Sequence, residues 1–145
     1  MANTKVGGRA GYNMGAVIEN ITEAKTLTPG DSGKVFTIDG GAGASAAYTI
    51  TLPKAADAVG FTAKFIFASA STYAVTIAPH ADEDTLVGNV QSSDGGVGGA
   101  TAESGVDELI FSLSAELGDW AEVICDGTYF YVSGGVHDTN HITLA

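Results

Sequence analysis

The feature that most constrains the fold of this chain is an alternation of apolar and polar residues with a period of two. It is clearest at residues 48–52, 61–67 and 73–77. Successive side chains of a strand point to opposite faces of a sheet, so this spacing predicts three half-buried strands. Segments rich in β-branched and aromatic residues predict further strands at 16–21, 34–39, 85–90, 109–113, 120–125 and 128–132.

Residues that favour turns separate these segments. They lie at 29–33, 40–47 and 79–84 and at Asp126-Gly127, which predicts a two-residue hairpin turn between 120–125 and 128–132. The one candidate for a helix, 54–59, is long enough for a single turn. Without a βαβ unit, the chain is predicted to be all-β. We expect a single β-sandwich or jelly-roll-like domain, with a β-tulip or a small β-barrel as the alternative.

The composition divides the 145 residues into three parts. Residues 1–15 are rich in glycine and predict a flexible N-terminal arm, residues 16–135 form the β-sandwich domain, and residues 136–145 are expected to be an exposed C-terminal tail. Within the domain, the glycine-rich segment 92–105 predicts a long mobile loop.

Charge limits the class of partner. Six basic and seventeen acidic residues give a formal net charge of −11, which opposes binding to nucleic acid. All six basic residues precede residue 65 and twelve of the acids follow it, which favours either an acidic, solubilising exterior or a molecule with one attached end. The N-terminus lacks the hydrophobic stretch of a signal peptide, and no apolar run reaches the roughly 20 residues of a membrane helix. We therefore expect a soluble protein that is made in the cytoplasm and has no membrane partner.

Several motifs resemble functional sites, but their sequence context favours a structural interpretation. The glycine-rich segment 41–46 precedes a predicted strand instead of the helix that a dinucleotide-binding turn needs, so it is predicted to be a flexible hairpin connection. Asp82, Glu83 and Asp84 lack the alternating spacing of a calcium loop and predict a solvated turn. Cys125, the single cysteine, is predicted to be a small core residue.

His137 and His141 are the candidate metal ligands. An extended segment would place both on one face, where they could capture a metal on a threefold axis, but the sequence shows no third ligand beside them. We therefore predict no metal, no cofactor and no catalytic residue. No serine lies in a glycine elbow, and although a pair of carboxylates in a cleft stays open, the chain is predicted not to be an enzyme.

Aromatic and basic residues provide the candidate contact sites. Trp120, Tyr129 and Tyr131 could stack on sugar rings, but their positions in strands favour packing in the core or at a trimer interface. Lys5, Arg9 and Tyr12 are the predicted contact residues of the N-terminal arm.

Four motifs carry a resemblance to a known group of proteins. They are TPGDSGKVF at 28–36, YTITLP at 48–53, Gly60-Phe61 with Phe65-Ile66, and DGTYF at 126–130. Together they resemble small virion proteins of tailed phages, above all the capsid decoration (cement) protein of the head. The resemblance implies a β-rich homotrimer on the capsid exterior that clamps the major capsid protein. A tail-fibre or receptor-binding domain is the alternative, with loops 40–47 and 92–105 contacting a host glycan.

Overall fold

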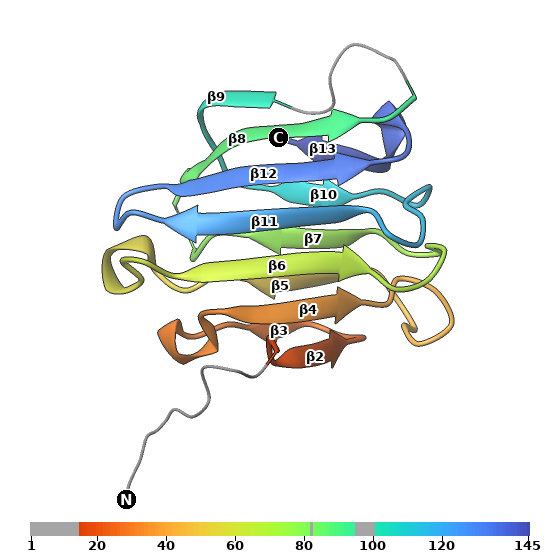
Figure 1. The fold of residues 1–145 in the computed structure, drawn as a ribbon, viewed down its shortest axis with the longest axis horizontal. Coiled ribbons are helices and arrows are strands. Elements are labelled where there is room, and N and C mark those ends of the chain that lie inside the picture. Colours follow the sequence, from red (N-terminus) through yellow and green to blue (C-terminus); the bar gives the residue numbers. More distant parts are fainter. Residues whose placement is uncertain (1–14, 82, 95–100) are drawn as a thin grey trace, which may run out of the picture.

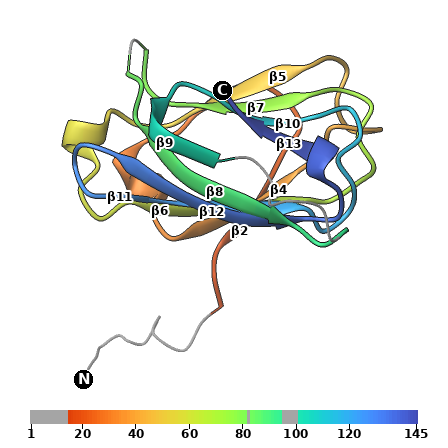
Figure 2. The same cartoon turned by 90° about the horizontal axis from the view of Figure 1, so that it is seen from above.

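The computed structural model describes residues 15–81, 83–94 and 101–145. Two β-sheets lie face to face, as the ribbon shows from the front (Figure 1) and from above (Figure 2). In spatial order the seven-stranded sheet contains β2 (Ile18–Ile21), β4 (Lys34–Ile38), β6 (Thr62–Phe67), β11 (Trp120–Cys125), β12 (Phe130–Val136), β8 (Leu86–Ser92) and β9 (Thr101–Val106). The five-stranded sheet contains β13 (Ile142–Leu144), β10 (Leu109–Phe111), β7 (Val75–Ala78), β5 (Tyr48–Thr51) and β3 (Lys25–Thr26).

Helical structure in the described ranges consists of short 3-10 turns. These are η2 (Pro29–Asp31), η3 (Ala55–Asp57) and η4 (Thr139–His141). None of them has the length or the apolar character of a membrane-spanning helix. The all-β prediction is confirmed, and η3 is the single turn expected at 54–59.

The order of the strands departs from a jelly roll. From β2 to β8 the chain crosses to the opposite sheet after every strand. When the chain returns to a sheet, the new strand runs in the same direction as the strand with which it pairs. The pairs β2–β4, β4–β6, β3–β5, β5–β7 and β8–β12 are consequently parallel. A jelly roll is an antiparallel architecture. The first half of this chain instead forms a flattened coil of parallel strands.

The hydrophobic core fills the space between the sheets. β6 shows the predicted alternation, with Ala63, Phe65 and Phe67 buried and the intervening residues partly exposed. Phe67 reaches across the core to Phe111 of β10, with ring centroids 5.0 Å apart. Burying a side chain of this size contributes about 1.5–3 kcal/mol. Cys125 is buried, as predicted.

Two predicted connections form differently. The β11–β12 hairpin is confirmed, but its turn spans residues 126–129, because Asp126 Oδ1 accepts hydrogen bonds from the N–H groups of Thr128 and Tyr129. The prediction of a flexible hairpin at 41–46 is wrong, because β4 and β5 lie in different sheets. This segment crosses between the sheets, and Asp39 fixes it by accepting hydrogen bonds from the N–H groups of Gly41 and Gly43.

The C-terminal prediction is also wrong. Instead of an exposed tail, residues 136–145 complete β12, form η4 and end in β13, which pairs antiparallel with β10. Ile142 is buried, so this segment belongs to the domain. Residues 101–105 of the predicted mobile loop lie in β9. Most of the predicted arm, with Lys5, Arg9 and Tyr12, lies outside the described residues.

Candidate functional site

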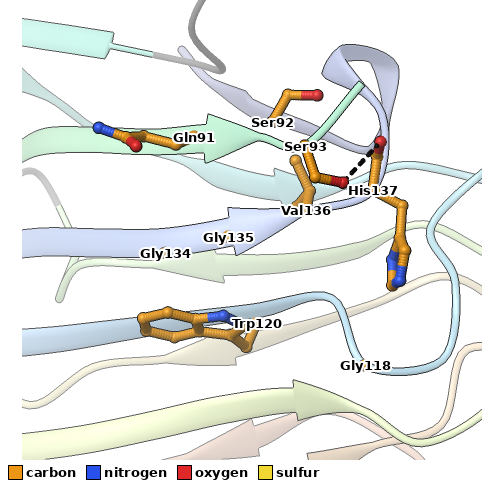
Figure 3. Close-up of a pocket in the computed structure, with 9 residues that line it drawn as sticks. All are labelled: Gln91, Ser92, Ser93, Gly118, Trp120, Gly134, Gly135, Val136 and His137. Carbon is orange, nitrogen blue, oxygen red and sulfur yellow. Dashed lines mark hydrogen bonds between the residues drawn. The ribbon is translucent and has the colours of Figure 1, made fainter. Parts of the chain in front are cut away.

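A depression lies at one end of the seven-stranded sheet, around Trp120. Trp120 is opposite Ile66 on one side and Gly135 on the other. A Cβ atom on Gly135 would lie 2.9 Å from the indole Nε1 of Trp120, and one on Gly134 would lie 2.5 Å from its backbone oxygen. The absence of a side chain at Gly135 therefore leaves room for the indole beside β12, and at Gly134 it allows the close approach of the two backbones (Figure 3).

The depression has a volume of about 440 Å³ and combines one aromatic ring with polar groups. Its lining residues are Gln91, Ser92, Ser93, Gly118, Trp120, Gly134, Gly135, Val136 and His137. The Nζ atom of Lys64 lies 4.3 Å from the centroid of the Trp120 ring and makes a cation–π contact with it. A flat apolar surface beside amide, hydroxyl and imidazole groups suits a ligand with both polar and apolar faces.

A cluster of three polar residues adjoins this depression. Nδ1 of His137 lies 2.7 Å from Oδ1 of Asp119, and Nδ1 of His141 lies 2.6 Å from Oδ2 of the same carboxylate. Asp119 is fully buried and His141 nearly so, whereas the side chain of His137 is 55% exposed. The cluster thus extends from the interior of the protein to its surface.

Local structure brings the three residues together. Asp119 closes a turn in which Glu116 N–H donates to its carboxylate at 2.8 Å. Because β11 and β12 are antiparallel neighbours, Asp119 before β11 lies beside His137 after β12, and the His137 N–H donates to Oδ1 at 2.9 Å. His141 ends η4, where Asp138 accepts a capping hydrogen bond from the Asn140 N–H.

Contacts within the cluster shift the pKa values of Asp119 and His137. Burial raises the pKa of Asp119, but hydrogen bonds from Glu116, His137 and His141 outweigh it, and the pKa is lowered overall. The hydrogen bond to Asp119, together with its negative charge, raises the pKa of His137. In the part of the chain that the structure describes, the two imidazoles are the only ion-pair partners of this buried carboxylate.

The sequence interpretation of the histidines was incomplete. His141 is buried rather than part of an exposed tail, and Asp119 is the third potential ligand that the sequence did not reveal. The hairpin signal at Asp126-Gly127 could have located it, since strand register places residues before β11 beside those after β12. The predicted two-residue turn, however, gives a register that differs by two residues from the one formed.

The predicted aromatic residues lie on the surface. Trp120 is partly exposed, and Tyr129 and Tyr131 are 40% and 47% exposed. Their side chains lie away from the core, so the prediction that they pack in the core is wrong for all three. Packing at a trimer interface stays a prediction.

Trp120 and Tyr131 belong to a larger surface with little charge, in which apolar residues lie among uncharged polar ones and which we call the outer face. It consists of the outward-pointing residues of β2, β4, β6, β11, β12 and β8. Its apolar members are Ile18, Val35, Ile66, Trp120, Ile124, Tyr131 and Val87. Ile124, Tyr131 and Val87 are direct neighbours across three strands. Among its described positions, Lys64 and Glu122 alone are charged.

The structure describes two of the three residues of the acidic turn at 82–84. Asp82 lies outside the described residues, and Glu83 accepts a hydrogen bond from the Ala55 N–H at 3.3 Å. This contact connects the turn to η3.

Comparisons with known proteins returned no match: no family model, no curated protein and no solved structure is similar to this chain.

Proposed function

We propose that the chain is a non-catalytic structural protein of a virion, a head decoration protein that binds the outer surface of the major capsid protein shell as a homotrimer. The proposal rests first on the resemblance of the motifs at 28–36, 48–53 and 126–130 to proteins of that kind. These motifs contribute η2, β4, β5 and the β11–β12 turn to the two-sheet domain.

The composition of the outer face is the observation that carries the proposal. On a chain with a net charge of −11, this face has one lysine and one glutamate among its described positions. Monomeric proteins rarely expose large apolar patches, and such patches mark interaction surfaces. Aromatic enrichment with depletion of charge is typical of the core of a protein–protein interface.

The outer face and the N-terminal arm have different roles in this proposal. The outer face packs against a neighbouring subunit through Ile124 and Tyr131, while the arm, with Lys5, Arg9 and Tyr12, contacts the shell. Each trimer then brings three arms to the capsid, so weak individual contacts add up through effective concentration. Stabilisation of the shell comes from this repeated contact area and needs no chemical step.

Light scattering of the purified full chain tests the assembly step. We expect the mass of a trimer for the wild type and for Thr49→Glu, which places the same charge on the exposed side of the other sheet. Tyr131→Glu inserts an unpaired charge into the outer face and should give the mass of a monomer. A monomeric wild type, or a Tyr131→Glu trimer, would refute the role assigned to this face.

A tail-fibre or receptor-binding domain is the second candidate, and the depression at Trp120 favours it. Ser92 and Ser93, from the loop predicted to contact glycan, line this depression, whereas Asp39 and Ser69 hold the other predicted loop at 40–47 against the domain. An indole beside hydroxyl and amide groups suits a sugar ring. Saturable binding on a glycan array that Trp120→Ala abolishes would favour this candidate over a decoration protein.

A further inference from the structure

We propose that Asp119, His137 and His141 form a binding site for a divalent transition metal ion, with zinc as the best chemical fit. The three side chains offer one carboxylate oxygen and two imidazole nitrogens within 4.8 Å of one another. Two histidines and one carboxylate, with a remaining position open to solvent, are a common ligand set for zinc and related metals. All three ligands come from the same chain, so the site is complete in one subunit.

The ligand atoms approach a metal geometry, but because they are spread over up to 4.8 Å, at least one imidazole must move for all three to bind one ion. Zinc binds nitrogen and oxygen at about 2.0–2.2 Å, which places tetrahedral ligands roughly 3–3.5 Å apart. The two contacts between the carboxylate and the imidazoles, at 2.7 and 2.6 Å, are already close to this spacing. His137 is the exposed member and can make the remaining adjustment, whereas Asp119 and His141 are held by the fold.

Electrostatics favours a cation at this position. A buried carboxylate is costly unless positive charge or hydrogen bonds compensate it. The Asp119 carboxylate accepts hydrogen bonds from the backbone N–H groups of Glu116 and His137. Within the described ranges its ion-pair partners are the two imidazoles, and no lysine or arginine is among them. When both imidazoles are neutral, a metal ion supplies the charge that this carboxylate lacks.

The surroundings also resemble those of a metal site. The Glu116 and His137 N–H groups orient the carboxylate in the way that outer hydrogen bonds orient metal ligands. The exposed ring of His137 lines the depression beside Trp120, so an ion can enter there (Figure 3).

Metal binding requires a change in the protons of the imidazoles. A neutral ring that donates its Nδ1 proton to Asp119 must carry that proton on Nε2 before Nδ1 can bind a metal, and a protonated ring must release one proton. This rearrangement distinguishes a metal site from a purely hydrogen-bonded cluster. It can be observed directly, because the two tautomers give different nitrogen NMR signals.

Calorimetric titration of the full chain, prepared without an affinity tag, tests the site. Zinc chloride added at about pH 8, above the ordinary pKa of a histidine side chain, should bind at one ion per chain. His137→Ala should weaken binding at least about 10-fold. His80→Ala is the matched control, since His80 is exposed and lies outside the cluster, and it should bind as the wild type does. Asp119→Asn, which removes the charge but keeps the shape, should also weaken binding.

Nitrogen NMR of the same samples provides the second measurement. On addition of zinc, the rings of His137 and His141 should both change to the form that is protonated on Nε2, while the ring of His80 should not change. A wild type that binds no zinc would overturn the proposal. So would equal loss of binding in His80→Ala and His137→Ala, or rings that keep their Nδ1 protons at saturating zinc.

Discussion

His141 Nδ1 lies 2.6 Å from Oδ2 of Asp119, and both side chains are buried. This contact joins η4, near the end of the chain, to the turn that precedes β11. The other carboxylate oxygen contacts both the ring and the backbone N–H of His137, directly after β12. One aspartate therefore connects three consecutive parts of the C-terminal region and contributes to the attachment of η4 to the domain.

Replacement of Asp119 should destabilise the domain strongly. Asp119→Ala leaves the Glu116 and His137 N–H groups and two imidazoles without their partner, and the loss of one member of such a buried pair costs about 3–5 kcal/mol. Glu116→Ala removes an exposed carboxylate from the same turn and should cost less than about 0.5 kcal/mol. Urea unfolding without added metal measures both variants, and similar midpoints would contradict the importance of Asp119.

The last strand should contribute to stability through one side chain. Ile142 is buried where β13 pairs with β10, so Ile142→Ala should lower the free energy of unfolding by about 2–4 kcal/mol. Thr143, the next residue of the strand, is exposed, and Thr143→Ala should have little effect. Thermal denaturation compares the two. If Ile142→Ala unfolds at the temperature of the wild type, β13 is not packed as described.

An acid-dependent contribution should come from Asp31. Partial burial raises its pKa, but hydrogen bonds from Lys34 and from the N–H and hydroxyl groups of Thr28 outweigh this and lower the pKa to about 2. Because the pKa in the folded protein lies below the ordinary aspartate value of 3.8, the contribution is complete above that pH and is lost as pH falls toward 2.

The variant Asp31→Asn tests this linkage. It should be less stable than the wild type by about 1–2 kcal/mol near pH 6, with about half of that difference remaining near pH 3. Denaturant unfolding at the two pH values measures the difference. A difference that is the same at both values would show that the charge of Asp31 is not involved.

Gly88 should not tolerate a side chain. It has a φ of +148°, and a Cβ atom there would collide with the backbone of Val132 on the neighbouring strand β12. Gly88→Ala should therefore disrupt the β8–β12 pairing and lower the yield of folded protein. Gly30→Ala is the control, because its Cβ would lie 3.5 Å from the nearest atom, which is an ordinary contact. Circular dichroism and solubility measurements compare the two variants. A folded Gly88→Ala protein would contradict the close approach of the Val132 backbone to Gly88.

The local features of the fold could be predicted from the sequence. Alternation within β6 identified Phe65 and Phe67 as inward-facing, because the period of a strand depends only on its own residues. Asp126-Gly127 likewise located a hairpin. Strands β3 and β13 were missed because two or three residues are too few to show a period.

The arrangement of strands and the candidate site depend on distant residues. The alternation of β4 is the same whether its neighbours run parallel or antiparallel, so the parallel coil of the first half left no local signal. Asp119 joins the two histidines only through the register of β11 and β12. That register depends on a four-residue turn held by the side chain of Asp126, which the Asp-Gly signal alone did not specify.

Cosedimentation of the purified chain with expanded empty phage heads tests the central claim most directly. We expect saturable binding in multiples of three chains. A variant that lacks residues 2–15 should keep the fold by circular dichroism but lose binding, and Thr49→Glu should bind as the wild type does. A folded wild-type chain that stays in the supernatant at all concentrations would contradict the decoration function.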